Sequence, residues 1–230
     1  MNKDYDKVTL VITSSNRLEL IRRTIYSFME FNTYPIEKYI IIDDSAIIRF
    51  HKELEREFGA MFEIITNTMR IGQIASIDKA YAAVKTPYVF HCEDDWEFYR
   101  TGFIELSLAL FYCDPKILQV WLRERNDTNG HPIEPGIYNT AGITYQKLVY
   151  DFQGYNGFSF NPGLKRMSDY ELIKPYGSVI YDSTHPGKRA KYYAPESEIS
   201  EFYKKRGYKA VIPMEGYVKH IGWEARVGWD

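Results

Sequence analysis

Cysteine is scarce in this chain, and long apolar runs are missing from it. Cys92 and Cys113 are the only cysteines among 230 residues, too few for the disulfide framework of a small secreted domain, so we expect a reducing compartment. No run approaches the roughly 20 apolar residues that a membrane-spanning helix needs. Residues 1–7 also lack the apolar stretch of a signal peptide. We therefore expect a cytoplasmic protein with no integral membrane segment.

Neither sign of charge is in excess. The chain has 29 Lys and Arg against 31 Asp and Glu, so its bulk charge gives no reason to expect a nucleic acid or an anionic membrane as partner. Hydrophobic residues make up 45% of the chain and aromatic residues 16%, which is enough for one sizeable core. We expect a single domain over residues 1–230.

Strands and helices alternate in the first half of the chain. Apolar, often β-branched runs typical of buried strands lie at residues 8–13, 39–42, 62–66 and 88–92. Apolar side chains recur at helical spacing in residues 18–28, 50–58 and 74–84. This order predicts a mostly parallel sheet with helices on both faces. Before the first helix, Asn16 and Glu19 have the spacing of a capping box.

The second half is less regular. We expect helices at 101–112 and 196–206 and strands at 117–122 and 208–213, with Gly207 ending the last helix. Residues 126–195 are rich in Gly, Pro, Asn and Tyr. We expect this segment to form loops and short antiparallel strands that shape the substrate site.

Polar clusters follow three of the predicted strands: Thr13 to Arg17, Asp43-Asp44 and Glu93-Asp94-Asp95. In parallel sheets, ligands bind beyond the carboxyl ends of the strands, so these clusters are expected to meet at one edge. Three consecutive carboxylates after a buried strand are costly unless a cation holds them. Such hard oxygen ligands suit Mg²⁺ or Mn²⁺, which commonly bridge to substrate phosphates. The pattern predicts a metal-assisted reaction on a phosphorylated substrate.

The segments Val11 to Arg17, Ile42 to Ser45 and Glu93 to Trp96 resemble the motifs of a family 2 glycosyltransferase of the GT-A fold, in the nucleotide-diphospho-sugar transferase superfamily. The resemblance covers residues 8 to about 120 and, by a second pattern, 194–213. It implies an α/β fold with a Rossmann-like, mixed but mostly parallel central sheet flanked by helices. Residues 8–122 would bind the nucleotide sugar and 123–230 the acceptor.

The same resemblance implies an activity. A sugar would move from a nucleotide-diphosphate donor, with a UDP-sugar favoured, to a glycan or other hydroxyl acceptor. Inversion of configuration and a role in glycan or surface polysaccharide synthesis are the expected outcomes. The cofactor would be Mn²⁺ or Mg²⁺.

The resemblance also implies roles for individual residues. The nucleotide side would be formed by Thr13, Ser15, Arg17, Asp43 or Asp44, Asn67, Gly72 and Asp94. Asp95 is the first choice as metal ligand, supported by Glu93 and by the C-terminal His220. Counting back from Gly207, Glu196 takes the position of the usual catalytic Asp, and Glu198 takes a second acidic position. Which of these two is the base stays open.

Each assignment has a structural alternative. Asp43-Asp44-Ser45 could simply form a turn, and Glu93-Asp94-Asp95 could cap a following helix. Glu196 and Glu198 could likewise serve the first turn of their own helix. His91 is expected to pack on the opposite face of its strand, and core packing is the default for Trp96, Trp121 and Trp223.

Two other functions compete with the glycosyltransferase. A nucleotidyltransferase shares the architecture and the acidic metal site, but Thr13 to Arg17 lacks the glycines of its phosphate loop. A non-catalytic module with a degenerate nucleotide or sugar site is the other alternative. The sequence leaves open the donor sugar, the acceptor, the stereochemical outcome and the oligomeric state.

Overall fold

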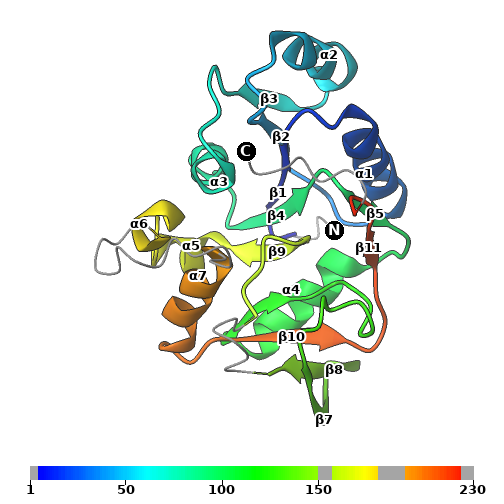
Figure 1. Ribbon diagram of the computed structural model, residues 1–230. Coiled ribbons are helices and arrows are strands. Elements are labelled where there is room, and N and C mark those ends of the chain that lie inside the picture. Colours follow the sequence, from blue (N-terminus) through cyan, green and yellow to red (C-terminus); the bar gives the residue numbers. More distant parts are fainter. Residues whose placement is uncertain (1–4, 150–156, 181–194, 224–230) are drawn as a thin grey trace.

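The computed structural model describes residues 5–149, 157–180 and 195–223. Its centre is a five-stranded sheet in the order β3-β2-β1-β4-β9 (Figure 1). The strands of this sheet are β1 (Val8–Ser14), β2 (Lys38–Asp43), β3 (Glu63–Thr66), β4 (Tyr88–Glu93) and β9 (Gly163–Arg166). The first four are parallel and β9 runs antiparallel to β4. The predicted mixed, mostly parallel sheet is confirmed.

Two smaller sheets complete the strands. The four-stranded sheet has the order β6-β10-β8-β7, and the two-stranded sheet pairs β5 with β11. Their members are β5 (Trp96–Phe98), β6 (Ile117–Val120), β7 (Ile133–Thr140), β8 (Ile143–Leu148), β10 (Lys209–Pro213) and β11 (Val218–His220). The antiparallel β7–β8 pair lies in the segment for which short antiparallel strands were predicted.

Helices cover both faces of the central sheet (Figure 1). The helices are α1 (Leu18–Phe31), α2 (Ile48–Phe58), α3 (Gln73–Tyr81), α4 (Phe103–Cys113), α5 (Met167–Glu171), α6 (Tyr176–Ile180) and α7 (Pro195–Lys204). Helix α4 packs between the two larger sheets, against β6 and β9. In the described part of the chain, none of these helices has the length and apolar content to cross a bilayer.

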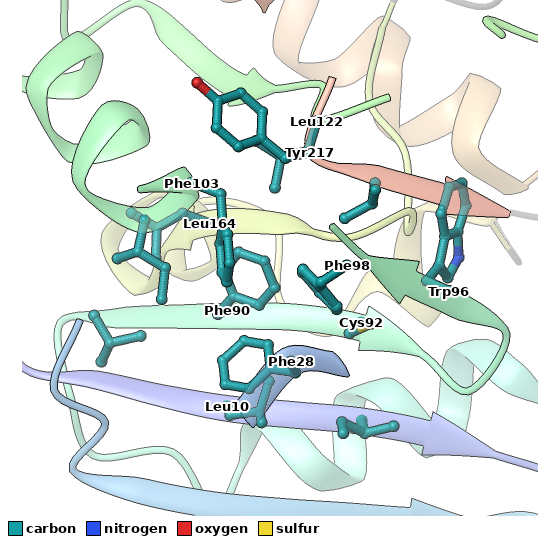
Figure 2. Packing of buried hydrophobic residues seen from close by; sticks show 14 of the residues in the cluster. Leu10, Phe28, Phe90, Cys92, Trp96, Phe98, Phe103, Leu122, Leu164 and Tyr217 are labelled. Carbon is teal, nitrogen blue, oxygen red and sulfur yellow. The ribbon is translucent and has the colours of Figure 1, made fainter. Parts of the chain in front are cut away.

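Side chains from the two faces of the central sheet pack into two separate apolar cores. On one face, Leu10 and Phe90 pack with Phe28 of α1 in the larger apolar cluster (Figure 2). The Phe28 ring centroid lies 5.2 Å from that of Phe98 and 5.7 Å from that of Phe103. Successive side chains of a strand point to opposite faces. The residues next to Leu10 and Phe90 in their strands therefore belong to the other core.

The second core is rich in tyrosine. Val11 and Ile40 pack there against α3, α6 and α7. His91 is fully buried in this core, with ring centroids 5.8 Å from Tyr81 and 5.6 Å from Phe160. The expectation that His91 packs on the opposite face of its strand is therefore confirmed.

Asp78 joins α3 to α6. Its carboxylate accepts hydrogen bonds from the Tyr170 hydroxyl at 2.7 Å and from the backbone N–H groups of Tyr176 at 2.9 Å and Gly177 at 3.1 Å. Hydrogen bonds to a charged acceptor are stronger than neutral ones. This one carboxylate therefore fixes the start of α6 against α3.

One local prediction and one structural alternative are wrong. Helix α1 begins after Arg17 with no side-chain cap, so Asn16 and Glu19 do not form a capping box. Asn16 instead adopts a left-handed conformation, with φ of 58°, and its N–H reaches Asp43 Oδ1 at 3.3 Å. The second error concerns the helix-capping alternative for Glu93 to Asp95. The chain continues into strand β5 there, and the next helix begins at Phe103.

Phe28→Ala should be among the most destabilising single substitutions in this fold. Phe28 is 1% exposed and its ring meets three other aromatic rings. Removing a buried ring of this kind costs about 3–5 kcal/mol, because apolar contact is lost and a cavity remains. The free energy of unfolding from urea titrations measures this loss.

Tyr26→Ala is the matched control on the same helix, since Tyr26 is 59% exposed. Surface substitutions of this kind cost about 1 kcal/mol or less. Equal losses in the two variants would contradict the assigned core.

Candidate active site

A cleft of about 850 Å³ opens at the carboxyl edge of the central sheet. Among the residues predicted for the site, those lining it are Thr13, Arg17, Asp44, Gly72, Glu93, Asp95 and His220. They come from the ends of β1, β2 and β4, from the loop before α3 and from β11. The sequence clusters that were expected to converge on one edge do so.

Arg17 bridges the two aspartates that follow β4. Its Nε donates to Asp94 Oδ2 at 3.2 Å and its Nη1 to Asp95 Oδ2 at 2.7 Å, while its Nη2 contacts Asp94 Oδ1. Asp94 is fully buried and also accepts from the Ser14 hydroxyl at 2.8 Å and the Ser15 N–H at 3.4 Å. Burial raises the pKa of Asp94 to about 6, with Arg17 acting in the opposite direction.

His220 meets Asp95 from the other end of the chain. The antiparallel β5–β11 pairing sets His220 opposite Trp96, and His220 Nε2 lies 3.3 Å from Asp95 Oδ2. Burial works to raise the pKa of Asp95, but His220 and Arg17 outweigh it and the pKa is lowered. A Cβ at position 222 would lie 2.7 Å from Asp95 Cβ, so this close approach requires Gly222.

Two buried polar atoms of this pair have no hydrogen-bond partner in the described structure: Asp95 Oδ1 and His220 Nδ1. Unpaired buried polar atoms are uncommon and indicate strain or an absent ligand. No group of three or more His, Cys, Asp or Glu side chains within the described ranges forms a ready metal site. Asp95 and His220 still fit Mn²⁺ or Mg²⁺, because these ions take many of their ligands from water and substrate phosphates.

Glu93 is held from two sides. Its Oε1 accepts from Gln73 Nε2 at 2.8 Å and its Oε2 from Trp96 Nε1 at 3.3 Å. Burial raises its pKa to about 8, with the charges of Asp95 and Glu196 adding to the effect. The pKa values of these two neighbouring acids are therefore displaced in opposite directions, upward for Glu93 and downward for Asp95.

The adjacent acids Asp43 and Asp44 have different surroundings. Asp44 lines the cleft, where its carboxylate accepts from the N–H groups of Ile71 and Gly72, both at 2.8 Å. Asp43 is fully buried away from the cleft and accepts from Ser45 N–H at 3.0 Å and His51 Nε2 at 3.0 Å. The turn alternative therefore describes Asp43, and Asp44 is the acid that a ligand in the cleft can reach.

The side chain of Asn67 contacts Asp44. Its side-chain amide donates to Asp44 Oδ1 at 2.8 Å and accepts from Lys79 Nζ at 2.6 Å. Gly72, with φ of +88°, directly precedes α3 and supplies one of the two backbone N–H groups that donate to Asp44. Ser15 and Asn67, both predicted for the nucleotide side, lie next to the cleft lining rather than in it.

Glu196 and Glu198 lie in the first turn of α7 and are not part of the cleft lining. The carboxylate of Glu196 accepts from the Phe160 N–H at 2.7 Å, a group on another segment, so it does not cap its own helix there. Burial raises the pKa of Glu196, while Phe160, Ser159 and Lys165 oppose the rise. The next residue after Phe160, Asn161, lines the cleft.

Lys165 is a buried cation near Glu196. It is 5% exposed and donates to the Ser159 carbonyl at 2.7 Å. Burial lowers the pKa of Lys165 to about 7, against the charges of Glu196 and Glu93, which raise it. This amine therefore changes its protonation state close to neutral pH.

Arg123 is a cleft residue that the sequence patterns did not single out. This residue is 6% exposed, lines the cleft, and donates to Asp127 Oδ1 at 2.8 Å. Its guanidinium carbon lies 5.1 Å from the Trp96 ring centroid, within range of a cation–π interaction. The available signal was its place directly after a predicted strand. Trp96 and Trp121 are core residues as expected, whereas Trp223 is 48% exposed and lines the cleft.

Replacing Lys165 by Met should remove a pH-dependent part of the stability. In the unfolded chain the pKa of Lys165 is about 10.5, against about 7 when folded. Between these values the unfolded state binds more protons, so the free energy of unfolding rises with pH. From pH 7 to pH 9, the free energy of unfolding of the wild type should rise by about 2 kcal/mol relative to that of Lys165→Met.

Urea titrations at the two pH values measure this difference. The control is Lys85→Met, because Lys85 is exposed and its replacement should give the same difference at both pH values. A Lys165→Met difference that does not change with pH would show that the amine is not held in a desolvated state.

Known proteins share this architecture. The mannosyltransferase PcManGT from Pyrobaculum calidifontis, in complex with GDP-Man and Mn²⁺, has 12% identity and a TM-score of 0.62 over 95% of this chain. GalNAc-T7 with UDP, GalNAc and Mn²⁺ has 13% identity and a TM-score of 0.64 over 98%. S. aureus TarS 1–349 has 8% identity and a TM-score of 0.59 over 92%. At such identities the likeness concerns the fold, and it confirms the predicted GT-A fold.

The chain spans about half the length of these solved structures, covering 57%, 46% and 59% of them. No curated protein matches its sequence. A family model, "Glycosyl transferase family 2", matches residues 9–172, which is most of the chain and includes all three strand-end clusters. The chain therefore belongs to glycosyl transferase family 2.

Proposed function

We propose that this protein transfers a sugar from a nucleotide-diphosphate donor to a hydroxyl group, with a divalent cation bound in the cleft. The observation that carries the proposal is the Asp95–His220 pair, which brings an unpartnered carboxylate oxygen to the carboxyl edge of the sheet. A UDP-sugar is the first choice of donor, and a GDP-sugar is the alternative. Related folds have been solved with UDP and with GDP-Man, both together with Mn²⁺.

Asp44 would recognise the nucleoside. Its oxygens already accept three hydrogen bonds from protein N–H groups, yet an ionised carboxylate has about four acceptor sites. The remaining site can accept from a base imide or a ribose hydroxyl. Thr13 and Gly72 line the same part of the cleft.

Asp95 and His220 would hold the cation, which supplies Lewis-acid stabilisation of the departing diphosphate. Arg17 stands beside them as a donor of hydrogen bonds to phosphate oxygens. Its planar fork suits phosphate as well as carboxylate. Arg123, across Trp96, adds a second positive charge to this part of the cleft.

Glu196 is our choice for the base that takes the proton of the acceptor hydroxyl. Its raised pKa brings it closer to the working pH than that of an ordinary carboxylate, which suits a general base. A single displacement assisted by this base would invert the anomeric configuration. We place the acceptor, a glycan or another hydroxyl compound, beside Asn161 and Trp223, in the half formed by residues 123–230.

We propose a cytoplasmic location and a role in glycan or surface polysaccharide synthesis. Both cysteines are free thiols, with Cys92 buried and Cys113 exposed. Free thiols of this kind are the common state in a reducing compartment.

Asp95→Asn should abolish metal-dependent binding of the nucleotide. Losing the charge removes the hard ligand, and we expect hydrolysis and transfer from UDP-sugars or GDP-sugars to fall by at least about 100-fold. Thermal shift of the protein with UDP or GDP, each with and without Mn²⁺, measures binding. Asp114→Asn is the control, because Asp114 pairs with Lys209 and neither residue lines the cleft.

Near-normal activity of Asp95→Asn would contradict the metal assignment. A wild-type protein that binds UDP with Mn²⁺ but never turns over any UDP-sugar would instead be a binding module. Release of pyrophosphate from a nucleoside triphosphate would indicate a nucleotidyltransferase.

Glu196→Gln should lower kcat by about 100-fold or more while the KM for the donor changes little, because the amide cannot take a proton. Glu198→Gln keeps Glu196 intact and should have the smaller effect. Steady-state kinetics with a fixed acceptor compare the two variants. A larger loss in Glu198→Gln would show that Glu198 is the base.

A further inference from the structure

We propose that Arg17 couples donor binding to metal binding. In the free protein its guanidinium is bonded to one oxygen of Asp95, Oδ2; when a donor binds, this contact passes to the diphosphate and both oxygens of Asp95 become available to the cation. This inference rests on the proposed function, because it requires a diphosphate and a divalent cation in this cleft. It assigns Arg17 a second task besides contact with the nucleotide.

The contacts of Arg17 divide into an anchor and a cap. The anchor is on Asp94, which receives both Nε at 3.2 Å and Nη2. The cap is the single bond from Nη1 to Asp95 Oδ2 at 2.7 Å. The side chain of Arg17 is 21% exposed and lines the cleft, so a ligand can reach it without the anchor being broken.

The anchor is hard to remove. Asp94 is fully buried, and a buried carboxylate that loses its positive partner is destabilised by several kcal/mol. Ser14 and Ser15 also donate hydrogen bonds to Asp94, but they carry no charge and cannot replace Arg17 as its positive partner. Arg17 therefore stays on Asp94, and the bond to Asp95 is the one that can be exchanged.

The two oxygens of Asp95 are used unequally. Oδ2 accepts from Arg17 and lies 3.3 Å from His220 Nε2, while Oδ1 has no partner in the described structure. A cation that approaches Asp95 meets the positive Arg17 next to it, and this repulsion lowers its affinity. A diphosphate that accepts from Arg17 Nη1 both withdraws that proton donor and adds negative charge.

Arg17 is distinguished from the other cationic side chains around the cleft by this contact. Arg123 pairs with Asp127 and packs over Trp96. Among the described Lys and Arg side chains around the cleft, Arg17 is the one that holds a permanent positive charge against Asp95. By thermodynamic linkage, the factor by which a nucleotide strengthens metal binding equals the factor by which the metal strengthens nucleotide binding.

Arg17→Gln tests the proposal through two binding constants, without a turnover assay. Isothermal titration with MnCl₂ in the absence of nucleotide should show tighter binding than wild type, by about tenfold. Titration with UDP or GDP in EDTA should show weaker binding, also by about tenfold. A residue that merely supports the fold would weaken both.

The matched control is Arg23→Gln. Arg23 lies on α1, the helix that directly follows Arg17, and its loss changes the net charge equally, but it pairs with Glu97 at 3.3 Å instead of the acid pair. We expect both constants of this variant to stay within about twofold of wild type. If Arg17→Gln does not fold, Arg17→Lys keeps the charge without the fork that spans two carboxylates, and should shift both constants in the same directions by less.

The outcomes separate the two proposals. Unchanged or weaker Mn²⁺ binding in the Arg17 variant, with wild type binding both Mn²⁺ and nucleotide, overturns the coupling role and leaves the proposed function standing. Unchanged metal-free nucleotide binding also overturns it. A wild-type protein that binds neither Mn²⁺ nor UDP nor GDP contradicts the proposed function itself.

Discussion

A guanidinium shared by two carboxylates is the interaction on which this site depends. Strand β4 lies inside the sheet and ends in Glu93, and the buried Asp94 follows it directly, where an unpaired charge would be prohibitively costly. Arg17 meets that requirement from the end of β1. The need explains a local irregularity: Arg17 stands where α1 would have a capping side chain, and its side chain serves the acid pair instead.

The same requirement organises the neighbouring strand. Because the chain must turn sharply after β1 to present Arg17, Asn16 takes a left-handed conformation and donates its N–H to Asp43. Asp43 therefore accepts hydrogen bonds from the backbone of the loops that follow β1 and β2, whereas Asp44 lines the cleft. The turn that carries Arg17 is thus bonded to Asp43, the one of the two adjacent aspartates that does not line the cleft.

Short-range patterns in the sequence predicted much of the fold. The strands and helices up to Thr66 follow from apolar runs and helical spacing, since both are local properties. The β5–β11 pair could not be predicted in this way, because each strand has only three residues and their partners are far apart in the chain. His220 was named for the site by family resemblance, and the pairing of β11 now gives the physical reason for its place.

The site residues were predictable where they end a strand and not where they depend on a partner segment. Asp95 and Arg17 belong to the first kind. Arg123 also follows a predicted strand, but its role could not be predicted from that position, because it depends on Trp96 of strand β5. Glu196 lies between these two cases. It was predicted as a site residue, but its hydrogen bond from the Phe160 N–H could not be predicted, because the loop that contains Phe160 has no regular pattern in the sequence.

The β5–β11 pairing has a consequence for biosynthesis. Asp95 and His220 are in contact although they lie far apart in the sequence, and a contact of this kind requires the closure of a long loop, which costs entropy. A nascent chain on the ribosome can complete the four parallel strands and the Arg17 ion pair long before β11 emerges. During that interval Asp95 already has its internal counter-ion but lacks the imidazole, so the cation site of the proposed function would form only after β11 has been added.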